Sequence, residues 1–241
     1  MSRILVTGSA DGLGRAAAAA LLDAGHEVVV HARSRERAAG LDPLVRRGAD
    51  LVVGDLADRE AVRRIAAEVE DAKPLDGVIH NAGVWNGPAV MPVNIIAPYL
   101  LTALIPQPRR VVYLSSGSHF GGRPSLSRVD WRGQRAGSYA DSKLFVTALA
   151  AAVARLRPDV LSNAVDPGWV PTKMGGPNAP DDLELGHQTQ QWLATSDDPS
   201  ARTSGGYWYH RQRQQPHPAV HDELFQDRLL QTLAQETGIT L

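Results

Sequence analysis

The chain of 241 residues contains no cysteine, which excludes disulfides, thiolate metal ligands and a cysteine nucleophile. Its 25 basic and 26 acidic residues leave a formal net charge of -1, so it lacks the basic surplus that binds nucleic acid or an anionic membrane. The longest apolar stretches are too short or too interrupted to span a bilayer. Gly8 breaks the apolar run after Arg3, which argues against a signal peptide. We therefore expect a cytoplasmic protein without nucleic-acid or membrane partners.

Metal-ligand patterns are also scarce. His217 and His221 lie four residues apart, a spacing that can hold a metal ion on a helix, but no third ligand is obvious. We expect these two histidines to be solvated and predict no metal site.

The chain does carry, near its start, an apolar strand that passes through glycines into a helix. The strand covers residues 4–6 and the alanine-rich helix covers residues 15–24. Such a turn directs free backbone N–H groups and the positive end of the helix dipole at a ligand above it. Gly8 suits the sharp turn, Gly12 allows close approach to phosphates, and Gly14 allows the helix to pack on the strand. This predicts a pyrophosphate site; the alternative is an ordinary strand–turn–helix corner.

Strand-like and helix-like segments alternate along the chain, which is typical of βαβ units and a parallel sheet. We predict strands over residues 4–6, 26–31, 49–53, 75–79, 110–114, 160–165 and 207–209. We predict helices over residues 15–24, 57–70, 93–104, 138–156 and 220–235, with one more after Ser34. The fold class is therefore α/β, a doubly wound Rossmann fold with a seven-stranded parallel sheet and helices on both faces.

No linker or repeat divides residues 1–241, so we expect a single dinucleotide-binding domain. The Gly/Pro-rich tract over residues 175–180 begins a long connection with few strong packing positions. It predicts a mobile substrate lid around residues 173–200.

The end of the second predicted strand carries Arg33, with Ser34 beside it and no acid. In a dinucleotide fold a carboxylate at this point bonds the free 2′-hydroxyl of NAD, whereas an arginine binds the 2′-phosphate of NADP. One or two charge-assisted hydrogen bonds of about 1.5–3 kcal/mol each would favour NADP(H) over NAD(H) by tenfold or more. The alternative is a solvated arginine at a basic helix start, since Arg35 and Arg37 follow.

Short motifs follow one another in a fixed order along the chain. They are Thr7-Gly8-xxx-Gly12-x-Gly14, Asp55-Leu56, Asn81-Ala82-Gly83, Asn94, Ser116, Tyr139-xxx-Lys143 and Pro167-Gly168-xxx-Thr172. The ordered set resembles the short-chain dehydrogenase/reductase family in its compact single-domain branch, over essentially the whole chain. Loop sequences look like those of the retinol-dehydrogenase-like and bacterial carbonyl-reductase-like members.

The resemblance implies roles for the residues that match the motifs. Asp55 would bond the adenine amine, with Leu56 beside it. Residues 81–83 would line the ribose region, and Val170 and Thr172 would hold the nicotinamide carboxamide. The predicted cofactor-binding residues are Gly8, Ser9, Asp11, Gly12, Leu13, Gly14, Arg33, Ser34, Asp55, Leu56, Asn81, Ala82, Gly83, Tyr139, Lys143, Pro167, Gly168, Val170 and Thr172.

Tyr139 and Lys143 lie four residues apart on a predicted helix, so they share one face. A phenol has a reference pKa near 10, and a neighbouring ammonium would lower this pKa toward neutrality. Lysine is rare in this chain, occurring only at positions 73, 143 and 173, so its use here indicates a specific need. An ammonium is compact and has movable donors that can bond ribose hydroxyls. The alternative is a chance Tyr/Lys pair on an amphipathic helix.

Ser116 ends the fifth predicted strand and would donate a hydrogen bond to a substrate carbonyl. Ser115 is the competing candidate; strand alternation turns only one of the two into a cleft, and the resemblance favours Ser116. Asn94 would hold a proton-relay water near Lys143 through its helix backbone, or would simply be a polar residue inside a helix. The predicted catalytic residues are Asn94, Ser116, Tyr139 and Lys143.

The favoured interpretation is an NADP(H)-dependent oxidoreductase that interconverts a carbonyl and an alcohol by hydride transfer. A non-catalytic NADP-binding regulatory protein is the alternative, although such relatives usually lack the Tyr–Lys pair. A sugar-nucleotide epimerase would resemble a longer chain. The expected partners are a small, apolar carbonyl or alcohol substrate and a second copy of the chain. However, the segments from Gly83 to Asn94 and from Leu101 to Arg110 are shorter than usual in this family, where the helix between them helps build the subunit interface, so the resemblance leaves the dimer or tetramer open.

Five aromatic residues fall in predicted loops over the strand ends. We expect them to line an apolar substrate pocket, except for some that belong to the core: Trp85, Phe120, Trp131, Trp169 and Trp192.

Overall fold

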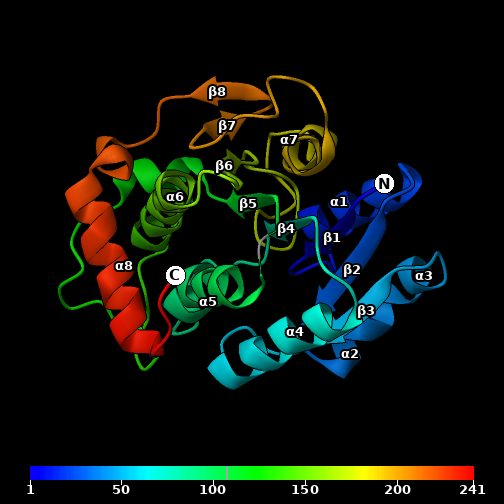
Figure 1. The fold of residues 1–241 in the computed structure, drawn as a ribbon, viewed down its shortest axis with the longest axis horizontal. Helices are drawn as coiled ribbons and strands as arrows, with labels where there is room; N and C mark the ends of the chain where they lie inside the picture. The colour runs from blue at the N-terminus through cyan, green and yellow to red at the C-terminus, as the bar shows by residue number, and fades with distance from the viewer. Residues whose placement is uncertain (107) are drawn as a thin grey trace.

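A single twisted sheet runs through the middle of the molecule in the computed structural model, which describes residues 1–106 and 108–241 (Figure 1). The described strands pair in the order β3-β2-β1-β4-β5-β6-β7-β8. Their bounds are β1 Arg3–Val6, β2 Glu27–Ala32, β3 Asp50–Val53, β4 Gly77–His80, β5 Arg110–Leu114, β6 Leu161–Asp166, β7 Tyr207–Tyr209 and β8 Gln212–Gln214. Strands β1 to β7 are parallel, which confirms the predicted doubly wound sheet.

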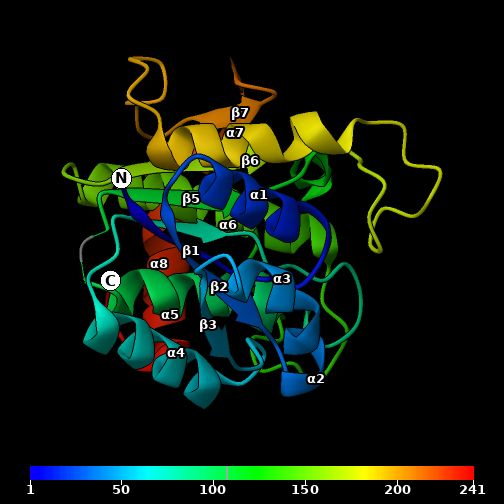
Figure 2. The same ribbon diagram turned by 90° about the vertical axis from the view of Figure 1, so that its right-hand side faces the viewer.

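The longer helices cover both faces of this sheet, as Figure 2 shows with α1 and α7 on one side and α4 and α5 on the other. The α-helices are α1 Gly12–Asp23, α2 Arg35–Ala38, α3 Asp42–Val45, α4 Arg59–Ala72, α5 Ala97–Leu104, α6 Tyr139–Leu156, α7 Leu183–Thr195 and α8 Glu223–Thr237. Alternate strand residues point to opposite faces, so each face has its own apolar core. One core packs under α4, α5, α6 and α8, and the other packs under α1 and α7.

Strand β8 was not predicted, and it corrects the expected strand number from seven to eight. It pairs antiparallel with β7, and all three of its residues are exposed. The turn before it places His210 and Arg211 at φ angles of 47° and 61°, a conformation in which glycine or asparagine is usual. An exposed, polar edge strand after a turn without glycine carries no hydrophobic alternation, so sequence patterns give no sign of it.

The predicted lid contains more regular structure than expected. Helix α7 occupies residues 183–195 within it and packs Leu193 and Ala194 into the core under α1. The part without helix or strand is therefore the connection between β6 and α7, which Figure 2 shows standing away from the body of the molecule.

The helix predicted over residues 93–104 begins as one π-helical turn, Pro92–Ile96, before α5. Pro98 explains this turn. Proline has no N–H and its ring would clash with the carbonyl oxygen of Asn94, four residues earlier, in a regular α-helix. A wider turn relieves the clash, and such turns occur often at functional sites.

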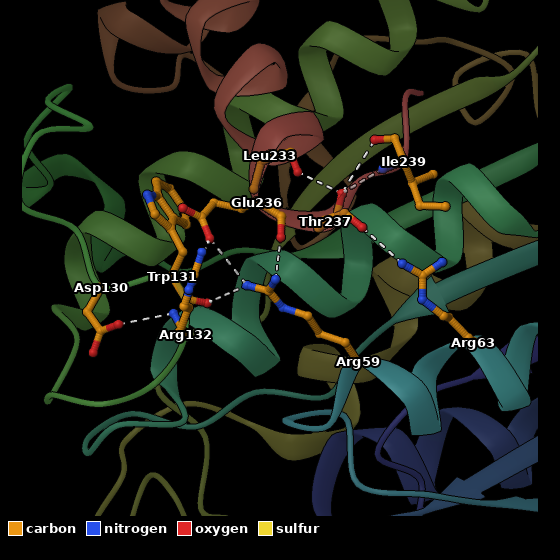
Figure 3. A network of polar contacts seen from close by, with 9 residues as sticks. All are labelled: Arg59, Arg63, Asp130, Trp131, Arg132, Leu233, Glu236, Thr237 and Ile239. Atoms are coloured by element: carbon orange, nitrogen blue, oxygen red, sulfur yellow. Dashed lines mark hydrogen bonds and ion pairs between the residues drawn. The ribbon is translucent and has the colours of Figure 1, made fainter.

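The carboxyl end of α8 is held by arginines of α4 (Figure 3). Arg59 donates hydrogen bonds to the carbonyl oxygens of Glu236 and Trp131, the latter at 3.2 Å. Arg63 donates to the carbonyl oxygen of Thr237 at 2.9 Å. Unpaired carbonyls at a helix end carry partial negative charge, so these guanidinium groups stabilise the end of the helix.

We expect Arg59→Met to lower the free energy of unfolding by about 1–3 kcal/mol, because charge-assisted bonds to partly buried carbonyls are lost. Urea unfolding followed by circular dichroism measures the change. Arg64→Met on the same helix is the control, since Arg64 is exposed and, among the described residues, has its one ion pair with Asp58, at 3.9 Å. Equal destabilisation by the two variants would contradict this role for Arg59.

Candidate active site

A cavity of about 590 Å³ lies at the carboxyl ends of β1 and β4, where the strand order reverses. This is the position at which doubly wound sheets bind ligands. Predicted residues from six separate segments line the cavity. They are Gly8, Asp11, Gly12, Leu13, Gly14, Arg33, Asp55, Leu56, Asn81, Ala82, Gly83, Tyr139, Lys143, Pro167 and Thr172.

The start of α1 is shaped to hold phosphate oxygens. Helices α4, α6, α7 and α8 each begin with an Asp or Ser side chain that accepts a backbone N–H, but no side chain of the described residues caps α1 in this way. Gly8 and Gly12 have positive φ angles of 66° and 54°. A Cβ atom on Gly14 would lie 2.6 Å from the Gly8 carbonyl oxygen, so only glycine lets the helix pack this closely. The uncapped N–H groups therefore face the cavity, where a pyrophosphate fits.

Two cations besides Arg33 line this cavity and were not predicted as site residues. Arg37 follows Arg33 in the sequence and lies on α2, and Lys173 comes from the connection after β6. Both form ion pairs with Asp11 in the glycine turn, Lys173 at 3.1 Å. Burial acts to raise the pKa of Asp11, but these two partners lower it overall. Arg37 was visible as a basic residue near Arg33, whereas nothing in the local sequence links Lys173 to Asp11.

Four predicted cofactor residues do not line this cavity: Gly168 and Val170, which line a second cavity described below, and Ser9 and Ser34. Ser9 is fully buried; its hydroxyl donates to the Val6 carbonyl oxygen and accepts the His31 N–H, each at 2.7 Å. The hydroxyl of Ser34 accepts the N–H of Arg37 and caps α2. Both hydroxyls form hydrogen bonds inside the fold, and their contact with the cofactor stays a prediction.

His31 was not predicted and lines the same cavity. Its Nδ1 accepts the N–H of Gly8 at 3.0 Å and its Nε2 lies 2.8 Å from the carbonyl oxygen of Gly54. Burial lowers the pKa of His31, so the ring stays neutral and donates to Gly54 from Nε2. This ring ties the glycine turn to the ends of β2 and β3.

A second cavity of about 540 Å³ adjoins the first, and Tyr139 lines both. Ser115 and Ser116 both line this second cavity, and Ser115 also lines the first, but the Ser115 hydroxyl is buried and bonds Thr147 at 2.6 Å. The Ser115 hydroxyl is therefore already engaged, which favours Ser116 as the predicted donor to a substrate. Gly168 and Val170 also line this cavity rather than the first one.

Burial raises the pKa of Tyr139, while contact with Ser116 lowers it and the charge of Asp166 raises it further. The expected lowering by Lys143 is absent within the described structure. The reason is geometric: the Lys143 ammonium lies 5.5 Å from the centre of the Tyr139 ring and donates to the carbonyl oxygen of Leu114 at 2.7 Å. The phenol therefore keeps its proton at neutral pH.

Lys143 itself is buried, and burial lowers the pKa of its ammonium to about 8. One pKa unit corresponds to about 1.4 kcal/mol, so keeping the charged form buried costs about 3 kcal/mol. Because the folded pKa lies below the unfolded value, the unfolded chain binds more protons between pH 8 and about 10.5. Stability from this group therefore rises with pH across that window.

We expect Lys143→Met to be more stable than the parent at pH 7, and this advantage to shrink by about 3 kcal/mol as the pH rises toward 10.5. The loss of one hydrogen bond to Leu114 offsets about 1 kcal/mol of the gain at every pH. Urea unfolding at several pH values measures both the pH-dependent gain in stability and the pH-independent loss of the hydrogen bond. Lys73→Met, which removes an exposed lysine, is the control. A difference between Lys143→Met and parent that grows with pH would contradict the assignment.

Asn94 sits in the π-helical turn and is buried. Its side chain is fully engaged: Oδ1 accepts the Val84 N–H at 2.9 Å, and Nδ2 donates to the Val84 carbonyl oxygen and to Ser142. Its own carbonyl has no i+4 donor, because that position is Pro98. The Asn94 side chain thus fixes the loop after β4.

The aromatic residues divide into two groups. Trp85 and Trp169 line the second cavity and are each 60% exposed. Trp131 is buried against Phe145, and Trp192 lies on α7 against Trp208, so neither borders the described cavities. Trp131 is thus one of the aromatic residues that were expected in the core, and Phe120, which packs on His119, also lies outside the described cavities.

His217 caps a short 3-10 helix through Nδ1, and no group of three potential metal ligands occurs in the described residues. In the part of the chain that the structure covers, no helix has the length and apolar character needed to cross a membrane.

Comparison with known proteins agrees with this site. The family model described as short chain dehydrogenase matches residues 2–105. The short-chain dehydrogenase chyC of Penicillium rubens is 36% identical, covering 100% of this chain and 99% of that protein. The 3-oxoacyl-[acyl-carrier-protein] reductase FabG of Aggregatibacter actinomycetemcomitans is 31% identical over 74% of this chain and 80% of its own. The Pseudomonas aeruginosa RhlG/NADP active-site complex shares the fold, with a TM-score of 0.69 and 21% identity over 86% of this chain and 93% of that one.

The chain therefore belongs to the short-chain dehydrogenase/reductase family. Its members bind NAD(P) and act on CH–OH and C=O groups, and this chain is an oxidoreductase of that kind with a small-molecule substrate.

Proposed function

We propose that the protein is an NADP(H)-dependent carbonyl reductase or alcohol dehydrogenase whose reacting groups are Ser116, Tyr139 and Lys143. One observation carries the proposal. Tyr139 lines both adjoining cavities, with Lys143 on the side of the glycine turn and Ser116 on the other side. A group at the junction can touch the cofactor and the substrate at the same time, as proton transfer coupled to hydride transfer requires.

Hydride exchange with a carbonyl carbon is the chemistry that the nicotinamide supplies when bound. Ser116 donates a hydrogen bond to the carbonyl oxygen and stabilises the negative charge that develops there. Tyr139 gives its proton to this oxygen in reduction and accepts one in oxidation. Its raised pKa keeps it protonated at neutral pH and so favours the role of acid in reduction. Lys143 would bond the cofactor ribose, and the backbone carbonyl of Asn94, which has no i+4 N–H partner because that position is Pro98, would hold a relay water.

The preference for NADP(H) over NAD(H) is supported by charge. Arg33 is exposed at the end of β2, and Arg37 lines the same cavity. The one acid in the glycine turn, Asp11, is paired with Arg37 and Lys173 rather than placed to bond a ribose hydroxyl. A 2′-phosphate would therefore meet guanidinium groups.

A shorter lid is part of the proposal. The connection between β6 and α7 contains Thr172, which lies where a Cβ on Gly12 would be 3.2 Å from its Cγ2, and Lys173, which pairs with Asp11. At these two residues the connection lies against the glycine turn, whereas another part of it stands away from the body of the molecule (Figure 2). We therefore assign the lid to residues 167–182 and the helix that follows to the scaffold.

The test is loss of NADPH absorbance with a panel of aldehydes, ketones, quinones and steroids. Enzyme-dependent oxidation that needs the carbonyl compound is the expected result. NADPH binding without turnover of any carbonyl or alcohol would favour the non-catalytic regulatory alternative.

A further inference from the structure

The second cavity, on the substrate side of Tyr139, holds two carboxylates, while none of the described residues that line it is a lysine or arginine. Asp166 ends β6 and Asp181 precedes α7. The Asp166 carboxylate accepts the N–H of Gly168 at 3.0 Å, and the Asp181 carboxylate accepts the N–H of Trp169 at 2.6 Å. Two successive N–H groups thus hold the two acids on one turn of the chain.

The negative charges of Asp166 and Asp181 both affect groups that line the second cavity. Asp166 also accepts the hydroxyl of Tyr207 at 2.9 Å, and its negative charge adds to burial in raising the pKa of Tyr139. The pKa of Tyr209, which lines the cavity, is raised by burial and then by the charges of Asp181 and Asp166. A bound substrate would lie in this negative field.

Two exposed indole rings border the same space. Trp85 comes from the loop after β4, and Trp169 comes from the lid. The Nε1 of Trp169 donates to the Gly175 carbonyl oxygen at 2.8 Å, which holds the ring in place. Indole faces attract flat apolar groups and, through their quadrupole, cations.

We infer that the cavity selects aromatic or similarly flat carbonyl substrates that carry a cationic amine, and rejects analogues that carry a carboxylate. The inference rests on the proposed function, because it concerns the substrate of that same site. The physical reason is that a cation gains from two carboxylates and two indoles, whereas an anion meets repulsion and finds no lysine or arginine among the described residues that line this cavity. Lys143, whose charge interacts with Asp166, lines the adjoining cavity instead. Neutral substrates should have a kcat/KM between that of the cationic and that of the anionic substrates.

The experiment compares three ketones of similar shape with NADPH: (4-acetylphenyl)trimethylammonium, 4-tert-butylacetophenone and 4-acetylbenzoate. We expect kcat/KM to fall in that order, by at least about tenfold from the cation to the anion. Asp181→Asn and Asp166→Asn should each reduce this ratio by about threefold or more, with the neutral ketone of the same variant as reference. Asp159→Asn removes an exposed acid at the opposite end of β6 and is the matched control.

A separate binding measurement distinguishes failure of this inference from failure of the proposed function. Quenching of tryptophan fluorescence by benzyltrimethylammonium and by phenylacetate is compared for the protein saturated with NADP. Tighter binding of the ammonium, lost in Asp181→Asn, supports the inference even if none of the ketones is reduced, and that lack of turnover would count against the proposed function alone. Equal binding, preference for the carboxylate, or charge ratios unchanged in both Asn variants would overturn the inference.

Discussion

Tyr139→Phe is expected to lower kcat for carbonyl reduction by about 10²–10⁴-fold while leaving the affinity for NADPH almost unchanged. The phenylalanine ring keeps the packing of the half-buried tyrosine but cannot give a proton to the substrate oxygen. Ser116 would still bind the carbonyl oxygen, so KM should change far less than kcat. Steady-state kinetics with a ketone from the panel measures both constants, and fluorescence titration measures NADPH affinity.

Tyr99→Phe is the matched control for this variant. It also removes one phenol hydroxyl, which bonds the Ile239 carbonyl oxygen at 2.7 Å far along the chain from the site. Loss of stability without loss of kcat is expected there. If Tyr139→Phe retained nearly full turnover, Tyr139 would not be the proton donor. Lys143→Arg keeps the charge but not its shape, so it should lose both activity and some cofactor affinity.

Arg33→Ala is expected to weaken NADPH binding by tenfold or more and to change NADH binding little, because only NADPH carries the 2′-phosphate. The estimate follows from one charge-assisted hydrogen bond of about 1.5–3 kcal/mol. Arg37→Ala should act in the same direction with a smaller effect, since Arg37 also pairs with Asp11. Titration of each variant with both reduced cofactors measures the selectivity.

Arg35→Ala is the control for charge in this region. Arg35 lies on the same short helix and is exposed, but it does not line the cavity. It should leave the NADPH:NADH ratio near that of the parent protein. Equal or tighter binding of NADH by the parent would contradict the proposed cofactor preference.

Much of the fold and of the cofactor cavity followed from local sequence. A strand that turns this sharply into a helix needs glycines at positions such as 8, 12 and 14, so the glycine spacing in the sequence predicts the turn. Parallel strands bring their carboxyl ends to one edge, and Arg33, Asp55 and residues 81–83 consequently meet in one cavity although they are far apart in the chain. The meeting of these residues follows once the strands are known to be parallel, and the alternation of strand-like and helix-like hydrophobic patterns along the chain predicts that they are.

The sequence alone also determined that Tyr139 and Lys143 share a helix face, because an i, i+4 spacing is a property of any α-helix. It did not determine how their side chains are used. Only the tertiary structure places the Lys143 ammonium on the carbonyl of Leu114, leaves the Tyr139 pKa raised, and uses the hydroxyls of Ser9 and Ser34 inside the fold. It alone joins Asp11 to Lys173 and places Asp166 and Asp181 in the second cavity, where none of the described lining residues is a lysine or arginine. Such features depend on side-chain directions and, as for Asp11 and Lys173, on contacts between segments that are far apart in the sequence, and burial and packing of the whole chain decide these.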